Sequence, residues 1–370
     1  MKRTPLYTDH VAAKATLVDF AGWEMPVTYG STADEVAAVR THAGAFDASH
    51  MGEFRVTGPG ARKFLQHVAT NDVERLTPGR QQYSLLLNED GGIVDDIIIR
   101  CLADDDYLLI VNAGCLEGDF IWVGGHAGGF ELTLTDESPQ TALIAIQGPD
   151  ARDIVVKLAE APALMDIPRF GFAPASIAGA EVVVSRTGYT GEDGFELFCA
   201  SDDASKVWNA AIAAGVVPAG LGARDVLRLE AAYPLYGHEL DGEHDPFESG
   251  VGWVVAMDKG PFVGRDAVET RLAAPEREKL VGLRVVQRAI PRQGCDVFAA
   301  NDTPAGKVLS GTLSPTLKYG IAIARVPEAL SEPGTELTID IRGRTVTSEV
   351  VPLPFYKKSV KRTKRPVSPA

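Results

Sequence analysis

Cysteine is scarce and scattered in this chain of 370 residues. No two of the four cysteines form a C-x-x-C pair, and the chain lacks the dense spacing of a small secreted domain; they are Cys101, Cys115, Cys199 and Cys295. We therefore expect reduced, buried thiols rather than a disulfide framework.

Basic residues are outnumbered, and long apolar runs are missing. Lys and Arg number 36 against 50 Asp and Glu, so the net charge is −14 at pH 7 with His neutral. That sign opposes the attraction on which most nucleic-acid binding depends. No run approaches the roughly 18 consecutive apolar residues that span a bilayer. The first residues resemble neither a signal peptide nor a transit peptide. We expect a cytoplasmic protein without nucleic-acid or membrane partners.

Motifs for metals and nucleotides are missing as well. His238 and His244 lack a third ligand at a useful spacing, so the sequence predicts no metal site. No expected strand is followed by a G-x-G-x-x-G run that opens a helix. We therefore predict no Rossmann site and no nicotinamide cofactor.

The composition and periodicity that are present indicate a globular protein with mixed structure. Hydrophobic residues make up 45% and charged residues 23% of the chain, and its length predicts two or three domains. Helical periodicity is clearest at 33–42, 60–69, 116–124, 149–160 and 204–214. Short strands are expected at 54–57, 97–101, 107–111, 130–134, 141–147, 181–185 and 195–199. Because these do not alternate regularly, we predict an α+β fold with mostly antiparallel sheets.

The character of the chain changes after about residue 260. The expected strands there form a small all-β, barrel-like module: 280–285, 307–309, 321–325, 336–341 and 345–351. We place a domain boundary between Met257 and Leu280. The segment from Lys357 to Ala370 is rich in Lys and Arg, which predicts a solvated tail.

Two adjacent carboxylates, Asp95 and Asp96, follow a turn at 88–92 and precede an apolar run. Neighbouring side chains of a strand point to opposite faces, so one carboxylate faces the side that the strand buries or lines. Burial there would raise its pKa and a cation would lower it. One of the two is therefore a catalytic candidate. A turn-capping pair on a solvated hairpin is the alternative.

A second polar region, 185–197, holds three glycines within seven residues together with Arg, Thr, Tyr and three acids. Glu196 lies between Phe195 and Leu197, so in a strand its side chain would face away from both. A carboxylate in that position can accept paired N–H donors from a flat heterocycle. An exposed acid on a hairpin is the alternative.

A third region, 220–230, carries Arg224 and Arg228 four residues apart. On a helix these two side chains share a face and can donate together to carboxylates. A surface network with Asp225 and Glu230 is the alternative.

Six motifs in one order resemble the aminomethyltransferase, or T-protein, family of the glycine cleavage system. The similarity runs from Thr4 to about Ser359, with Ala48 where the family often has Val. The motifs are DFAGWEMP at 19–26, FDASHMG at 46–52, GGIVDD at 91–96, and the segments 185–196, 220–230 and 310–317.

The resemblance implies three domains in a ring around a central folate channel. The first domain would be discontinuous, with residues 1–50 and about 140–260. An inserted α+β domain would hold about 51–139 with Asp95 and Asp96, and the all-β domain about 275–360, followed by a tail at 361–370. The resemblance implies that Asp96 is the essential carboxylate. It places Glu196 and Arg228 at the pterin end, with Arg224 as a partner behind them. The other residues implied to line the site are Met51, Tyr83, Asn112, Tyr189, Tyr236 and, from a weaker match, Tyr356.

The implied reaction transfers the methylene of an aminomethyl group from the lipoyl arm of a carrier protein, the H-protein, to tetrahydrofolate. The products would be ammonia and 5,10-methylenetetrahydrofolate, with no flavin, metal or covalent enzyme intermediate. Another folate-dependent transferase or demethylase of the same superfamily is the alternative enzyme. A non-catalytic folate protein of iron–sulfur assembly is a further alternative. It is disfavoured because residues 186–192 lack the cysteine of the expected K-G-C-Y-x-G-Q motif.

Overall fold

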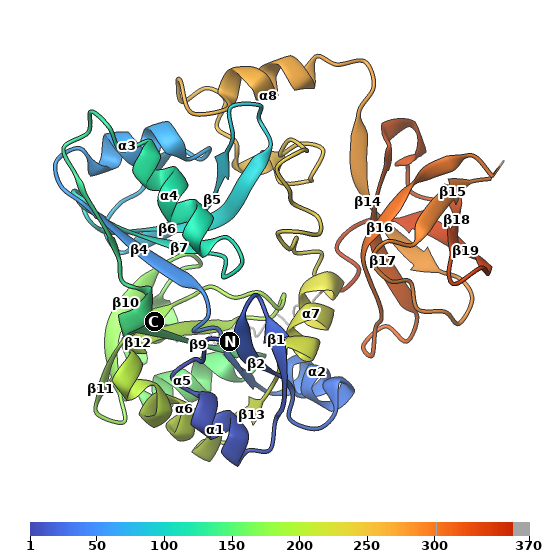
Figure 1. The fold of residues 1–370 in the computed structure, drawn as a ribbon. Coiled ribbons are helices and arrows are strands. Elements are labelled where there is room, and N and C mark those ends of the chain that lie inside the picture. The colour runs from blue at the N-terminus through green and yellow to red at the C-terminus, as the bar shows by residue number, and fades with distance from the viewer. Residues whose placement is uncertain (301, 358–370) are drawn as a thin grey trace, which may run out of the picture.

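The computed structural model describes residues 1–300 and 302–357. Their strands form a two-stranded hairpin, two open sheets and a closed barrel (Figure 1). The hairpin pairs β1 (Thr16–Phe20) with β2 (Trp23–Thr28). None of the helices in these residues is long and apolar enough to cross a membrane. The tail predicted at 361–370 lies outside the described residues.

The larger open sheet has six strands in the order β10-β11-β12-β9-β3-β13, antiparallel except where β13 pairs with β3. Apolar side chains of its strands pack against α5, α6 and Leu6, which precedes α1, on one face and against α2 and α7 on the other. The strands are β3 (Gly44–Asp47), β9 (Thr141–Gln147), β10 (Phe172–Ile177), β11 (Ala180–Ser185), β12 (Gly194–Ala200) and β13 (Val217–Pro218). The helices are α1 (Tyr7–Ala12), α2 (Thr32–Thr41), α5 (Ala151–Leu158), α6 (Ala204–Ala213) and α7 (Leu221–Glu230).

The second open sheet has five antiparallel strands in the order β5-β6-β7-β4-β8. Helices α3 (Ala61–Val68) and α4 (Leu116–Gly125) pack on one face of it. The strands are β4 (Gly52–Thr57), β5 (Arg80–Leu87), β6 (Ile93–Ala103), β7 (Asp106–Val111) and β8 (Thr133–Asp136). All five lie between β3 and β9 in the sequence, so the six-stranded sheet is built from segments on both sides of this one.

The other face of the five-stranded sheet packs against the six-stranded sheet. Ile110 of β7 and Ile98 of β6 share an apolar cluster with Leu143 and Phe198 of the larger sheet. Met51, in the link between β3 and β4, lies in the same cluster. This contact fixes the face of β6 that carries Asp96 against the larger sheet.

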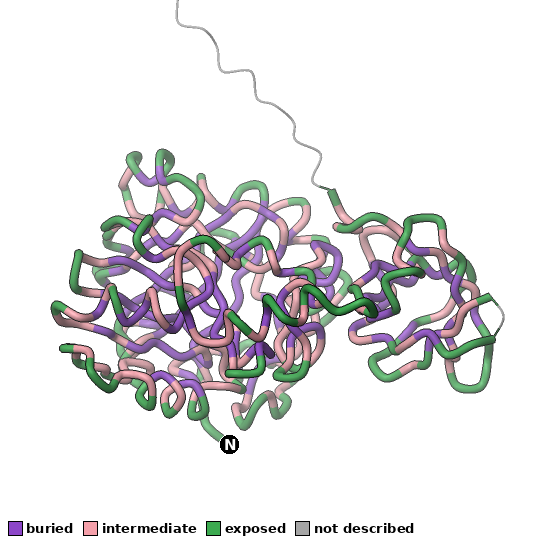
Figure 2. Tube along the Cα trace, turned by 90° about the horizontal axis from the view of Figure 1, so that it is seen from above, coloured by how far each residue is buried: buried purple, intermediate pink, exposed green. Residues whose placement is uncertain are grey.

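The C-terminal strands close into an antiparallel barrel in the order β14-β17-β16-β15-β18-β19. The barrel lies beside the rest of the molecule with its own buried interior (Figures 1 and 2). Leu229 of α7 packs against Ile321 and Ile323 of β17 and so joins the two parts. The strands are β14 (Glu278–Val285), β15 (Asp296–Ala299), β16 (Pro304–Leu313), β17 (Gly320–Pro327), β18 (Glu336–Asp340) and β19 (Thr345–Val351), preceded by α8 (Arg265–Leu272).

The predicted α+β class, the antiparallel sheets and the C-terminal barrel are confirmed. The strand expected at 130–134 is wrong by several residues, because β8 is Thr133–Asp136 and Phe130 instead packs on Phe64 of α3. All four cysteines are free thiols as expected, but Cys115 and Cys295 are only partly buried. The domain boundaries given above stay a prediction.

Candidate active site

The two adjacent carboxylates lie at the start of β6 and point to opposite faces of the five-stranded sheet. Asp95 is 0% exposed, whereas Asp96 is partly buried. Asn112, which follows β7, joins them: its Nδ2 donates to Asp95 Oδ1 at 2.9 Å and to Asp96 Oδ1 at 2.8 Å. The hydroxyl of Tyr83 on β5 donates to Asp96 Oδ2 at 3.0 Å. Both oxygens of Asp96 are therefore held by neutral donors.

The pKa of Asp96 is raised to about 7. Burial is the main cause and the charge of Asp95 adds to it, while the hydrogen bonds from Tyr83 and Asn112 oppose the shift. A carboxyl group with such a pKa exchanges its proton near neutral pH, which suits a general acid or base. Asp96 therefore has the electrostatic setting of a catalytic group.

The turn before β6 fixes where these carboxylates lie. Asn88 closes it, with its Oδ1 accepting from Gly92 N at 2.9 Å and its Nδ2 donating to Gly242 O at 2.9 Å. A Cβ on Gly92 would lie only 1.8 Å from Gly242 O. The turn is therefore pressed against the loop after residue 240, and glycine is required at position 92.

Aromatic side chains lie beside both carboxylates of β6, with Tyr83 at Asp96 and Tyr236 near Asp95. The Tyr83 ring stacks on Trp253, with centroids 5.8 Å apart and an interplanar angle of 20°. Trp253 is 73% exposed although it is a large apolar side chain. Tyr236 donates its hydroxyl to Ile93 O at 3.2 Å. Sequence reasoning missed Trp253, because no pattern in its own segment relates it to Tyr83.

A second polar group is formed by Glu196 of β12, Arg224 of α7, and Thr187 and Tyr189 of the loop before β12. Thr187 Oγ1 donates to Glu196 Oε2 at 2.5 Å, and the Arg224 guanidinium lies 4.9 Å from the centre of the Tyr189 ring. Burial lowers the pKa of Arg224, and the charges of Tyr189 and Glu196 oppose that shift. Within the described residues, the Arg224 side chain has no hydrogen bond or ion pair. Its donors are therefore available to a ligand.

Tyr189 contacts the rest of this group directly. Its hydroxyl donates to Pro234 O, its ring stacks on Tyr233, and the Arg224 guanidinium lies near the ring. Burial raises the pKa of its phenol; the charges of Arg228 and Arg224 lower that pKa, and the charge of Asp96 raises it. His50 also faces this region: burial, together with the charge of Arg224, lowers its pKa to about 4, so it is neutral at pH 7.

Arg228 uses its side-chain donors within the protein. It is 1% exposed, and its nitrogens donate to Asp225, to Glu239 Oε2 at 2.9 Å and to Ser310 Oγ at 2.7 Å. Ser310 belongs to β16, so Arg228 joins α7 to the barrel. These donors are used within the protein, whereas those of Arg224 have no hydrogen-bond partner among the described residues. The pterin role of Arg228 stays a prediction, and Arg224 is taken up as a candidate for that role under the proposed function.

The remaining predicted residues lie in three settings. Tyr83 and Asn112 contact Asp96 directly, and Met51 packs in the apolar cluster that includes Ile98, two residues beyond Asp96 on the same face of β6. Tyr356 lies away from Asp96, at the junction with the barrel. Its backbone N–H donates to Glu230 O at 2.8 Å, and its ring lies 4.0 Å from the Arg40 guanidinium. The assignment of all these residues to a ligand stays a prediction.

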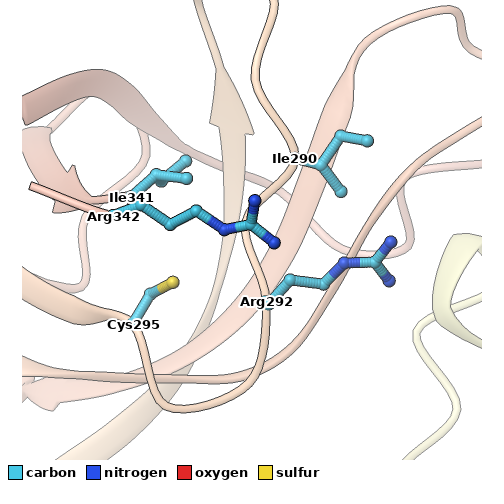
Figure 3. Close-up of a pocket in the computed structure, with 5 residues that line it drawn as sticks. All are labelled: Ile290, Arg292, Cys295, Ile341 and Arg342. Atoms are coloured by element: carbon cyan, nitrogen blue, oxygen red, sulfur yellow. The ribbon is translucent and has the colours of Figure 1, made fainter. Parts of the chain in front are cut away.

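A cavity of about 380 Å³ lies in the barrel and is lined by Ile290, Arg292, Cys295, Ile341 and Arg342 (Figure 3). None of these five side chains is a carboxylate or an imidazole, so this cavity lacks a proton acceptor of the kind found at Asp96. The chemistry therefore points to β6 and α7 and not to the barrel cavity.

Comparison with known proteins agrees with this architecture. Residues 6–259 match the GCVT N-terminal domain, and residues 278–357 match the glycine cleavage T-protein C-terminal barrel domain. The aminomethyltransferase of Geobacillus kaustophilus is 46% identical over 365 residues, which cover 97% of this chain and 100% of that protein. That of Chloroherpeton thalassium is 47% identical over 364 residues, with 97% and 100% covered.

A solved structure extends the match to the fold. The crystal structure of the glycine cleavage system aminomethyltransferase T from Bartonella henselae superposes with a TM-score of 0.90 at 34% identity, covering 96% of this chain and 98% of that one. The identity extends over nearly the whole length of each protein compared, so it does not reflect one shared domain. With two domain matches and full-length relatives in agreement, this chain belongs to the glycine cleavage T-protein family.

Proposed function

We propose that this aminomethyltransferase transfers the methylene of an aminomethyl group on the lipoyl arm of a carrier protein to tetrahydrofolate. The products are ammonia, 5,10-methylenetetrahydrofolate and the carrier, whose lipoyl arm is left in its dithiol (dihydrolipoyl) form. The observation that supports the proposal most strongly is Asp96: a carboxyl group with a pKa near 7, held by Tyr83 and Asn112 beside an aromatic face. The compartment we propose is the cytoplasm.

Asp96 is the group that we assign to proton movement and charge stabilisation. Joining a folate nitrogen to the transferred carbon releases a proton and passes through positive charge next to that carbon. A carboxylate stabilises that charge and accepts or relays the proton. Since the ionised form of Asp96 does this work, activity should fall as the pH drops below about 7.

Glu196 and Arg224 suit the pterin end of tetrahydrofolate. The pterin presents neighbouring N–H donors on one edge, which a carboxylate accepts in pairs, and a carbonyl oxygen, which a guanidinium can donate to. Thr187 already donates to one oxygen of Glu196, and this hydrogen bond fixes the direction in which the carboxylate points. The two groups therefore serve binding and orientation, whereas Asp96 serves the reaction.

The test is an assay of the purified protein with tetrahydrofolate and an aminomethylated lipoyl carrier. Ammonia and methylenetetrahydrofolate should form in equal amounts. A carrier without its lipoyl group is the control and should give neither product. If methylated amines or sulfonium compounds serve as donors and the lipoyl carrier does not, the protein is instead a folate-dependent demethylase.

A further inference from the structure

Asp119 lies on α4, behind the face of β6 that carries Asp95. It is 1% exposed, and its Oδ2 has no hydrogen-bond partner within the described residues. Side-chain atoms of Asp95, Cys115 and Asp119 all lie within 4.8 Å of one another. Two carboxyl groups this close and this buried cannot both stay ionised without a cation between them.

Hydrogen bonds from Asn112 connect Asp95 to Asp96. The backbone N–H of Asn112 donates to Asp95 Oδ2 at 2.9 Å, and its Nδ2 donates to Asp95 Oδ1 at 2.9 Å. The same Nδ2 donates to Asp96 Oδ1 at 2.8 Å. Asp95 therefore orients the amide that holds Asp96, and it does so only while both of its oxygens accept hydrogen bonds.

We propose that Asp119 is a positioning residue for the transfer reaction: it holds a proton that it donates to Asp95, so that Asp95 stays an acceptor for Asn112 and Asn112 keeps Asp96 in place. The proposal rests on the proposed function of Asp96.

The groups that face Asp119 support this assignment. They are Asp95 and Asp96 from β6, Cys115 from α4 and Tyr236 from the loop after α7, and none of them is a cation. Burial, followed by the charge of Asp95, raises the pKa of Asp119 to about 10. Asp119 lies in the first turn of α4, where the helix dipole favours an anion. Burial and the neighbouring acids raise the pKa of Asp119 by more than the helix dipole lowers it.

Three variants test the proposal. Asp119→Asn keeps an N–H donor toward Asp95, Asp119→Ala removes it, and Glu117→Gln changes an exposed acid in the same helical turn as a matched control. For each variant, kcat and the KM for tetrahydrofolate are measured across pH, together with the thermal unfolding midpoint.

We expect Asp119→Ala to lower kcat about tenfold with the KM changed less than about threefold, because Asp95 loses its donor and Asn112 loses its fixed acceptor. Asp95 then takes up a proton, which removes a negative charge beside Asp96 and moves the acid limb of the pH profile to lower pH. Asp119→Asn should keep the parent acid limb and at least about a third of kcat. Glu117→Gln should match the parent throughout.

If Asp119→Asn and Asp119→Ala behave alike, either both shifted or both unchanged, the proposal is overturned. If Asp119→Ala does not fold, Asp119→Asn still decides, because a displaced acid limb in that variant means that Asp119 acts as an anion.

Infrared spectroscopy separates this proposal from the proposed function, since it needs no turnover. The spectra are compared at about pH 8.5, where Asp96 is ionised and Asp119 is still protonated. The parent-minus-Asp119→Asn difference spectrum should contain a protonated carboxyl band that the parent-minus-Glu117→Gln spectrum lacks, and bands of other buried acids such as Glu53 cancel in both. If the first difference spectrum lacks that band, the proton is not held where we place it, whatever the enzyme's activity.

Discussion

Two regions of the molecule bury several charged side chains, and they handle the charges in opposite ways. Around α7, two buried cations meet buried acids: Arg40 pairs with Glu230 at 2.7 Å, and Arg228 pairs with Glu239 at 2.9 Å. At the start of β6, the acids face other acids and neutral donors. The side chains that donate hydrogen bonds to Asp96 there are Tyr83 and Asn112.

This difference distinguishes a region that stabilises the fold, around α7, from a region that can carry out a reaction, at β6. Around α7 the opposite charges stabilise each other, and Glu230 also accepts from Ser314 at 2.5 Å and from Thr316 at 3.0 Å, both of which follow β16. That network holds the barrel to the rest of the chain. At β6 the uncompensated burial raises carboxyl pKa values, and such shifts mark sites where protons move. Paired buried charges thus indicate an architectural contact, and unpaired ones indicate a reactive centre.

The largest effect is expected from Asp96→Asn. The amide keeps the shape of the side chain but cannot accept a proton, so kcat should fall by about a hundredfold to ten-thousandfold at saturating tetrahydrofolate. Binding of tetrahydrofolate, measured by calorimetry, should change little. Parent-like turnover in this variant would mean that the acid cluster on β6 is structural, as the α7 network is.

Arg228→Ala should mainly affect stability. It leaves the buried Glu239 without its cation, so the free energy of unfolding should fall by about 3–5 kcal/mol in denaturant titrations. Arg265→Ala is the control, because its ion pairs on α8 are exposed and should contribute below about 1 kcal/mol. A stable Arg228→Ala variant with weakened folate binding would restore Arg228 to the pterin site.

Arg224→Ala and Glu196→Ala should mainly affect affinity. Loss of a charged hydrogen-bond partner costs about 1.5 to 3 kcal/mol, so the Kd for tetrahydrofolate should rise roughly tenfold to hundredfold. The unfolding midpoint of Arg224→Ala should stay near that of the parent, because its side chain has no ion pair among the described residues. Arg284→Ala, in an exposed pair with Glu349, should leave the Kd unchanged. Parent-like affinity in both site variants would exclude the assignment.

The smallest effect is a change in how stability depends on pH. Asp96 has a pKa of about 7 when folded and about 3.9 when unfolded, so the folded state holds more protons between these values. Its contribution to stability is therefore present at low pH and is lost as the pH rises toward 7. Asp96→Asn should reduce the loss of unfolding free energy between pH 5 and pH 7, measured with urea. Parallel curves for parent and variant would mean that the pKa of Asp96 is not raised.

Local patterns in the sequence predict part of this architecture. The helical period gives α2 to α6 to within a few residues, and the alternation in β12 puts Glu196 opposite Phe195 and Leu197, which are fully buried. Very short strands such as β3 and β13 carry too few residues to show a period, and their pairing is set by contacts distant in sequence.

The roles of the two arginines on α7 could not be predicted in the same way. Arg224 and Arg228 are alike in type and share a helix, and they differ only in which partners reach them. Besides Asp225 on the same helix, Arg228 has partners 11 and 82 residues away, at Glu239 and Ser310, and no pattern in the α7 segment predicts either of these two. Likewise, the sequence identifies Asp119 only as an acid in the first turn of an expected helix. Its closeness to Asp95 arises only when α4 packs on the sheet.

The adjacency of Asp95 and Asp96 on β6 limits how this segment can change in length. The turn at Gly92 is fixed against Gly242, so adding or deleting one residue between it and the aspartates would turn each carboxylate to the opposite face of the sheet. Asp95 would then point toward the larger sheet and Asp96 toward α4. A substitution can change Asp95 or Asp96 alone. Any insertion or deletion of odd length, in contrast, exchanges the faces of the sheet toward which both side chains point.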